Sequence, residues 1–242
     1  MYEPRLYRYQ IKDSDLASFN VVVKQTDLYI RARRNLKHKA MKSVLKHRTP
    51  LEKYIEQHPL FLTTLEPYQA EEDAPLIIKE MARASQMAGV GPMAAVAGAI
   101  AEAVGRDLLA YSPELIIENG GDIFLKTSKK RLVGLYAGQQ SPFTGRIALE
   151  IRPEETPLGI CTSSATVGHS LSLGSADAVV VLSPSTPLAD AMATAIGNMV
   201  KNVDDIPKAI QTAQNMEVLH GIAIIKDEKI AIWGKVKIVP LN

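Results

Sequence analysis

A short helical pattern in the C-terminal half places a carboxylate and a hydroxyl on one side of a helix. The segment "STPLADAMATAIGN" offers Thr186 as an N-cap and Pro187 at the first helical position. Asp190 and Thr194 are four residues apart, so their oxygens can converge on one point. The opposite face is apolar: Leu188, Ala191, Met192, Ala195, Ile196 and Met199. A carboxylate and a hydroxyl oxygen are suitable ligands for Mg²⁺. The alternative is that Asp190 complements the helix dipole and Thr194 faces solvent, with no metal bound.

A polar segment upstream of this helix, "TSSATVGHS", carries Thr162, Ser163, Ser164 and His169 between two predicted strands. Its hydroxyl groups could bind phosphate or ribose oxygens. His169 could act as an acid, a base or a hydrogen-bond donor. A Ser/His hydrolase is the weaker interpretation, because the chain lacks a G-x-S-x-G elbow and an obvious third triad member.

Two glycine-containing stretches could bring backbone close to a ligand. In "ENGGDIFL", Asn119 and Gly120 predict a tight hairpin turn, since both residue types tolerate positive φ. Gly121 and Asp122 exceed what that turn requires, so the stretch could also contact a ligand. Gly91 and the nearby Gly89 precede a helix of small residues that begins near Pro92, and helix N-termini favour anions and metal-bound phosphate groups.

The elements that must position these residues form a mixed pattern. A strand pair, "SFNVVV" and "LYIRA", precedes a basic helix to about residue 57 that we expect to be interrupted at Thr49 and Pro50. Further helices are predicted from Leu76 to about Met87, in the small-residue segment, at about 187–200 and at about 206–216. Strands are predicted at "DIFLKT", "KRLVGLYA", "RIALEI", "LGICTS", "ADAVVVLS" and in a closing hairpin, "GIAIIKD" and "EKIAIWGKVKIV".

This order of elements predicts an α+β, mixed α/β layered fold. We expect residues 1–242 to form a single domain, in which 1–68 supply the strand pair and basic helix and 69–242 form the core. No segment has the composition of a transmembrane span, and the start of the chain lacks the apolar stretch of a secretory signal. We therefore expect a cytoplasmic protein with no membrane partner.

Charge and cysteine content narrow the classes of function. Eight Lys or Arg fall between Arg31 and Arg48, but apolar residues recur at helical spacing there: Leu36, Ala40, Met41, Val44 and Leu45. A solvated basic face is therefore favoured over a nucleic-acid surface. Cys161 is the only cysteine, so there is no intrachain disulfide, and we expect a buried, inert thiol.

The chemical motifs together resemble one family. "NGGDI" resembles the Asn-x-Gly-Gly-Asp-Ile segment of the ApbE family of FAD-dependent flavin transferases. "CTSS" is similar to its Thr-Ser-Gly segment, "GHS" to its Ser-His segment, and "LADAMATAIGN" to its Ala-Asp-Ala-x-x-Thr-Ala helix. "GVGPMAAVAG" aligns with its Gly-Gly-Ile-Ala-Lys-Gly helix start. The motifs occur in the family's order and span about 89–198.

The resemblance implies a ligand and a reaction. Members of the family bind FAD and Mg²⁺, cleave the diphosphate and pass FMN to a threonine or serine of an acceptor protein, releasing AMP; some hydrolyse FAD to FMN and AMP. It implies two intimate lobes with the site between them, metal ligation by Asp190, Thr194 and the Gly91 carbonyl, and His169 near the flavin or acceptor. The implied flavin-binding residues are Asn119, Gly120, Gly121, Asp122, Thr162, Ser163 and Ser164. Asp190 could alternatively orient the attacking hydroxyl.

Some positions depart from the family pattern. Pro92 stands where the family has lysine and Ser164 where it has glycine, and the Asp-Pro-x-Thr-Gly segment after His169 is missing. The first 68 residues lack the family's adenine-side motifs. The leading hypothesis is a divergent cytoplasmic flavin transferase or FAD pyrophosphatase, with a flavin nucleotide, an acceptor protein and a second copy of the chain as candidate partners. The alternative is a non-catalytic flavin- or nucleotide-binding protein of an anaerobic redox or sulfur-assimilation pathway.

Overall fold

An eight-stranded antiparallel sheet forms the centre of the molecule. The computed structural model describes residues 15–165 and 173–241. In spatial order the strands are β1 (Ala17–Val23), β2 (Thr26–Ala32), β3 (Leu115–Asn119), β4 (Asp122–Lys126), β7 (Leu158–Ser163), β8 (Ala178–Ser183), β9 (Gly221–Lys226) and β10 (Lys229–Gly234). A second antiparallel sheet has the order β11 (Ile238–Pro240), β6 (Ile147–Ile151) and β5 (Arg131–Gly134). The N-terminal strands β1 and β2 therefore belong to the same sheet as the strands of the core.

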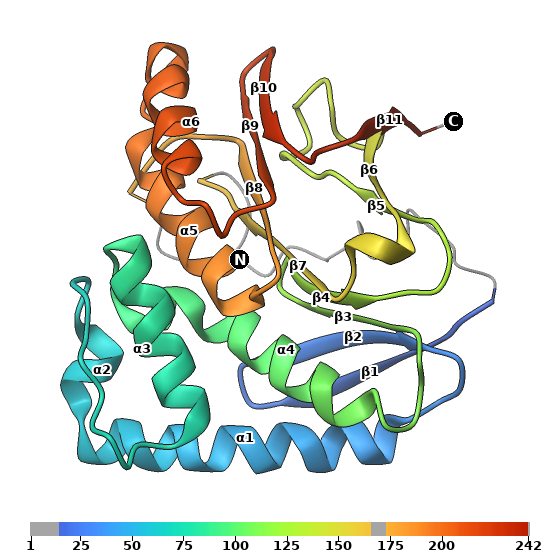
Figure 1. Ribbon diagram of the computed structural model, residues 1–242, viewed down its shortest axis with the longest axis vertical. Coiled ribbons are helices and arrows are strands. Elements are labelled where there is room, and N and C mark those ends of the chain that lie inside the picture. Colours follow the sequence, from blue (N-terminus) through green and yellow to red (C-terminus); the bar gives the residue numbers. More distant parts are fainter. Residues whose placement is uncertain (1–14, 166–172, 242) are drawn as a thin grey trace.

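Helices cover one face of the large sheet and the small sheet covers the other (Figure 1). The α-helices are α1 (Lys37–Gln57), α2 (Pro59–Thr63), α3 (Leu76–Ala88), α4 (Val96–Leu108), α5 (Thr186–Met199) and α6 (Ile206–Gln214). The described residues also form three short 3-10 helices, η2 (Pro92–Ala95), η3 (Pro153–Glu155) and η4 (Val203–Asp205). The predicted α+β, mixed α/β layered fold is confirmed.

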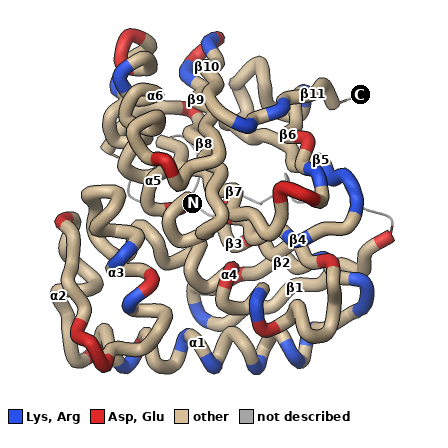
Figure 2. Tube along the Cα trace, in the orientation of Figure 1, with Lys and Arg blue, Asp and Glu red and all other residues tan. Residues whose placement is uncertain are grey.

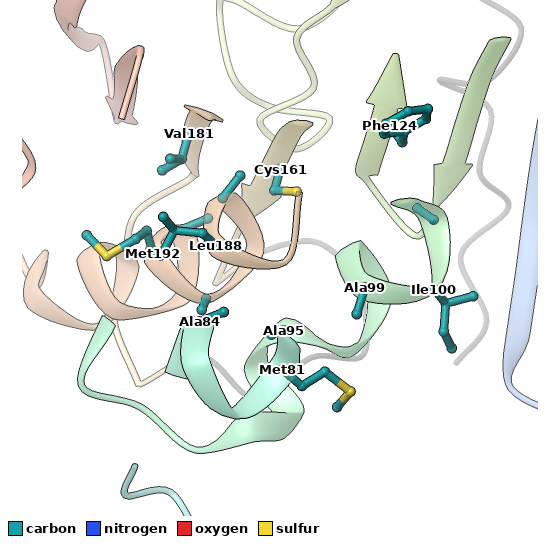
Figure 3. Close-up of a cluster of buried hydrophobic side chains, with 14 of the residues drawn as sticks. Met81, Ala84, Ala95, Ala99, Ile100, Phe124, Cys161, Val181, Leu188 and Met192 are labelled. Carbon is teal, nitrogen blue, oxygen red and sulfur yellow. The ribbon is translucent and has the colours of Figure 1, made fainter. Parts of the chain in front are cut away.

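Strand alternation divides the buried side chains into two cores. On the helix side, Ile117 belongs to the same core as residues of the helices. Phe124, Cys161 and Val181 belong to it too, together with helix residues such as Met81, Leu188 and Met192 (Figure 3). On the other side, the neighbouring strand residues pack against the small sheet; they include Leu125, Ile160, Val180 and Leu182. A residue's place in its strand therefore decides which layer its side chain enters.

The small residues of α4 allow this helix to lie very close to its neighbours. A Cβ on Gly105 would lie 2.2 Å from the Phe124 ring, and a Cβ on Gly98 would lie 2.6 Å from the Thr186 carbonyl oxygen. α4 packs against β3 and β4 of the sheet and against α5. The expectation that this segment would pack closely on a sheet or helix is confirmed, and Gly98 and Gly105 are the positions where a side chain has no space.

Several local expectations were wrong. α1 runs through Pro50 without interruption, because buried Leu51 and Tyr54 continue its packing and offset the one backbone hydrogen bond that proline removes. Leu45 is 46% exposed instead of facing the core. The N-cap of α5 is Ser185, whose side chain accepts from the Leu188 N–H; Thr186 is already helical and fully buried.

The C-terminal segment also differs in part from expectation. β9 and β10 form the predicted antiparallel hairpin. The chain then turns at Gly234, which has φ of 81°, and β11 joins the small sheet instead of extending the hairpin. A left-handed backbone conformation favours glycine, so this residue permits the change of sheet.

The basic helix α1 lies along one side of the molecule, with Lys and Arg recurring along it (Figure 2). Lys46 and His47 contact Asp107 of α4 at 2.8 and 2.9 Å and so tie the two helices together. Lys37 and Lys42 are exposed, as expected for a solvated basic face.

Among the described residues, no single helix has the length and apolar composition to cross a membrane; α3 with the 92–108 segment reaches them only as a pair bent by 106°.

Candidate functional site

The β3–β4 hairpin places two polar side chains on the helix side of the sheet. Its central residues are Gly120 and Gly121, with φ of 70° and 109°, and Asn119 pairs with Asp122 across the hairpin. The predicted Asn-Gly turn is therefore displaced by one residue, because two glycines satisfy two positive-φ positions better than Asn and Gly do. Asn119 and Asp122 become strand residues, each 7% exposed.

The start of α4 is held from both sides by site residues. Asn119 Nδ2 donates to the Ala97 carbonyl oxygen at 3.1 Å, and the Gly98 N–H donates to Asp190 Oδ2 at 2.8 Å. These two backbone groups belong to the same peptide unit. The hairpin, α4 and α5 therefore meet at the Ala97–Gly98 peptide.

The Asp122 carboxylate lies close enough to Asp190, beside this peptide, to act on it electrostatically. Burial raises the pKa of Asp190 well above its usual range, the Asp122 carboxylate raises it further, and the N–H groups of Gly98 and Ala97 oppose the rise. Cys161 lies beside both carboxylates and is fully buried. Burial, then Asp122 and Asp190, raise the pKa of its thiol, as expected for an inert cysteine. Negative charge gathered in a partly buried place is where a divalent cation would be stabilised.

The donor set suits a hard cation and does not suit zinc. Within the described residues, no group of three or more His, Cys, Asp or Glu is placed to hold a metal ion. Any cation at Asp190 would therefore take its other ligands from hydroxyls, backbone carbonyls, water and substrate phosphate, as Mg²⁺ does. Thr194 lies one helical turn after Asp190 and is partly exposed.

Gly91 has a packing role that the sequence did not reveal. A Cβ there would lie 1.9 Å from the Thr64 carbonyl oxygen, so the close approach of residues 64 and 65 requires glycine. The Gly91 carbonyl accepts from the Ala94 N–H at 3.1 Å, which leaves one lone pair for another partner. Its predicted role as a third metal ligand stays a prediction.

The polar segment that begins at the end of β7 is split between the two faces of the sheet. Ser163 pairs with Val179 on the helix side, and its Oγ would lie 3.2 Å from a Cβ on Gly197 of α5. Thr162 pairs with Val180, which belongs to the opposite core, so strand alternation directs its side chain away from Asp190. Ser164 follows the strand and is half-buried, and His169 lies outside the described residues.

Glu102 was missed in the sequence, although it is the lone acid in a run of small residues. It is 3% exposed, and its Oε2 accepts from the Thr186 N–H at 2.6 Å at the first residue of α5. Its other carboxylate oxygen pairs with Arg106. A carboxylate at a helix N-terminus complements the helix dipole, so Glu102 fixes the helix that carries Asp190.

A groove of about 310 Å³ lies on the adjacent side of α5, between the end of α3 and α6. It is lined mostly by small residues and four methionines: Met87, Met192, Met199 and Met216. Asn198 and Thr212 supply polar groups there. The groove offers apolar surface next to the face of α5 that carries Thr194.

Solved structures define the class of fold. The ApbE protein of Thermotoga maritima matches with a TM-score of 0.61 and 10% identity, covering 90% of this chain and 96% of that one. The flavin transferase ApbE of Vibrio cholerae, in its H257G mutant form, matches with a TM-score of 0.57 and 12% identity, over 90% and 96% of the two chains. The chain therefore has the ApbE flavin-transferase fold.

Sequence comparison shows the family. A family model described as AbpE bacteria matches residues 8–227. A UPF0280 protein of Methanocaldococcus jannaschii is 42% identical over 222 residues, 89% of this chain and 90% of the relative. A UPF0280 protein of Methanopyrus kandleri is 41% identical over 233 residues, 93% and 94% of the two chains. This chain belongs to the ApbE-like family, and these UPF0280 proteins are its relatives within a divergent branch.

Proposed function

We propose that the protein is a Mg²⁺-dependent enzyme that cleaves the diphosphate of FAD and passes FMN to a protein threonine or serine, or to water. The observation that carries the proposal is the position of Asp190, which accepts from the Gly98 N–H at the start of α4 and lies near the Asp122 carboxylate. A carboxylate pair next to a helix N-terminus is suited to a complex of a divalent cation and a diphosphate, since the cation neutralises the carboxylates and the helix end favours the phosphate. Family membership and fold support the same reaction.

Asp190 and Thr194 would hold the cation, with the Gly91 carbonyl as a further ligand. When bound there, Mg²⁺ would neutralise negative charge on the diphosphate during its cleavage. Asp190 could alternatively accept the proton of the attacking hydroxyl. The two roles predict different results for an Asp190 variant. Loss of a metal ligand lowers the affinity for the cation, whereas loss of a base changes the pH dependence of AMP release.

The flavin would lie against the hairpin and the strand beside it. Gly120 and Gly121 would let backbone approach it, and Asn119 and Asp122 would shape that wall. Ser163 faces the same layer, whereas Thr162 could contribute only through its backbone: its carbonyl oxygen lies 3.9 Å from a Cβ built on Gly121. His169 near the flavin or acceptor and Ser164 near the phosphate stay predictions from the sequence.

Chromatographic measurement of AMP released from FAD tests this function. We expect release with Mg²⁺, no release with EDTA, and loss of release in Asp190→Ala and Thr194→Ala. The matched control is Asp107→Ala, which removes a carboxylate that ties α1 to α4 away from Asp190. Full turnover by Asp190→Ala would contradict the proposal.

A second candidate is a non-catalytic flavin- or nucleotide-binding protein of an anaerobic redox or sulfur-assimilation pathway. The observation that favours it is Pro92, which is buried at the start of η2, so no side-chain amine stands where the family has lysine. Tight binding of FAD without AMP release under Mg²⁺ or Mn²⁺ would support this function over catalysis.

A further inference from the structure

We infer that Asn119 is a positioning residue, which sets the direction of the Asp190 carboxylate through the Ala97–Gly98 peptide instead of contacting the flavin. The inference rests on the proposed function, because it concerns the cation that Asp190 would hold. It changes the role of Asn119 from ligand contact to a group that acts through another residue.

The two contacts on this peptide lie on its opposite sides, because the C=O and N–H of a trans peptide point in opposite directions. Asn119 Nδ2 donates to its carbonyl oxygen at 3.1 Å, and its N–H donates to Asp190 Oδ2 at 2.8 Å. A peptide unit is planar and rigid, so fixing the carbonyl also fixes the direction of the N–H. That N–H in turn holds Oδ2, and a carboxylate with one oxygen held has its other oxygen directed as well.

The backbone of the hairpin places Asn119 where it can act in this way. Leu115 and Ile117 precede it at alternate positions and belong to the core on the helix side. Asn119 continues that row because the turn is formed by Gly120 and Gly121. With Asn119 in the turn itself, as a sequence-based Asn-Gly turn would have it, the amide would not extend from the strand toward Ala97.

Close packing fixes how closely the peptide and α5 approach each other. A Cβ on Gly98 would lie 2.6 Å from the Thr186 carbonyl oxygen and 3.0 Å from Asp190 Cβ. There is no space for even a methyl group between the two helices at this point. The distance from the Gly98 N–H to Asp190 is therefore set by contact, and its direction is set by Asn119.

A structural hydrogen bond would contribute to stability alone, whereas a positioning residue also changes cation affinity. Partners that orient metal ligands typically change metal affinity by about 10- to 100-fold when removed. The two roles are separated by measuring cation binding and thermal stability on the same variants. Mn²⁺ is a suitable probe, since it shares the oxygen-ligand preference of Mg²⁺ and its free form is measured by electron paramagnetic resonance.

The experiment titrates Mn²⁺ into the full-length protein, with and without FAD, and compares two pairs of variants. Asn119→Ala removes the amide, and its control Asn202→Ala removes an asparagine that caps the backbone of η4. Gly98→Ala pushes α4 away from Asp190. Its control, Gly105→Ala, adds the same methyl group elsewhere in α4, where it lies against Phe124 of β4. Asp190→Asn defines the loss of the site, and thermal unfolding is measured for every variant.

We expect Asn119→Ala and Gly98→Ala each to raise the Mn²⁺ dissociation constant by about 10- to 100-fold. Both controls should keep the wild-type value even where they lower the melting temperature. Wild-type affinity in a folded Asn119→Ala protein, with affinity lost in Asp190→Asn, would overturn the inference and leave the proposed function standing. Absence of Mn²⁺ binding by the wild-type protein, with and without FAD, would overturn both. If Asn119→Ala fails to fold, Asn119→Ser decides in its place, because it also removes the amide that donates to the Ala97 carbonyl oxygen.

Discussion

Replacing Glu114 with glutamine should cost the protein about 3 kcal/mol of stability at neutral pH. Glu114 is 1% exposed near the start of β3. Its Oε1 accepts from Ser128 at 2.6 Å and from Arg33 at 2.9 Å, and its Oε2 accepts from Arg131 at 2.7 Å. Burial raises the pKa of Glu114, but these three donors outweigh burial and lower it from 4.5 to about 2.

The magnitude follows from this pKa. The difference of about 2.5 between 4.5 and about 2, at about 1.36 kcal/mol per pKa unit, corresponds to about 3 kcal/mol. Because the folded protein binds the proton more weakly than the unfolded chain, the stabilisation is complete above about pH 5 and is lost as the pH falls toward 2. More than half of it should be lost by about pH 3. A glutamine in this place also leaves the charge of buried Arg131 less compensated, which acts in the same direction.

Equilibrium urea unfolding at a series of pH values measures this effect, with Trp233 fluorescence and circular dichroism as probes. The gap between wild type and Glu114→Gln should be about 3 kcal/mol at pH 7 and should narrow as the pH falls toward 3. Glu118→Gln is the matched control, since Glu118 Oε1 accepts from the Gly121 N–H and an amide oxygen can do the same. A gap below about 0.5 kcal/mol at pH 7, or one that does not change with pH, would refute the reasoning.

Three further substitutions or treatments have defined outcomes. Gly121→Ala should lower the free energy of unfolding by about 1–3 kcal/mol, because φ is 109°, and an unchanged urea midpoint would be inconsistent with that backbone. Phe61→Ala should lose about 3–5 kcal/mol in the same assay, since Phe61 is fully buried; a loss below 1 kcal/mol would argue against its packing. Cys161 should resist a thiol reagent until urea unfolds the chain, and rapid labelling of the native protein would contradict its burial.

Hydrophobic pattern predicted the fold because burial leaves a direct trace in sequence. The continuous apolar run in β8 is buried on both faces, as a strand between helices and a second sheet must be. The small residues of α4 predicted close packing, and Gly98 and Gly105 confirm it. In β8 the constraint is burial and in α4 it is close packing, and each of these determines both the residue types and the three-dimensional contacts.

The details of the site depended on register, which composition does not determine. A displacement of the turn by one residue moved Asn119 from the turn into the strand, within reach of α4. Strand alternation separated Thr162 from Ser163, although the two are adjacent in sequence. When the two glycines are aligned with those of the family's Asn-x-Gly-Gly-Asp-Ile segment, Glu118 and not Asn119 occupies the asparagine position. The shared residue types therefore did not identify the equivalent side chain. The displacement of the turn has a local cause, the glycine pair, whereas the separation of Thr162 from Ser163 comes from the pairing of β7 with β8, which the local motif does not contain.

Calorimetric titration of FAD with and without Mg²⁺, into wild type and Asp190→Ala, tests the central claim most directly. The account predicts that Mg²⁺ strengthens FAD binding to the wild-type protein and that this dependence disappears in Asp190→Ala. Equal FAD affinity with and without Mg²⁺ in the wild-type protein, or an unchanged Mg²⁺ dependence in Asp190→Ala, would contradict a diphosphate and cation site at Asp190.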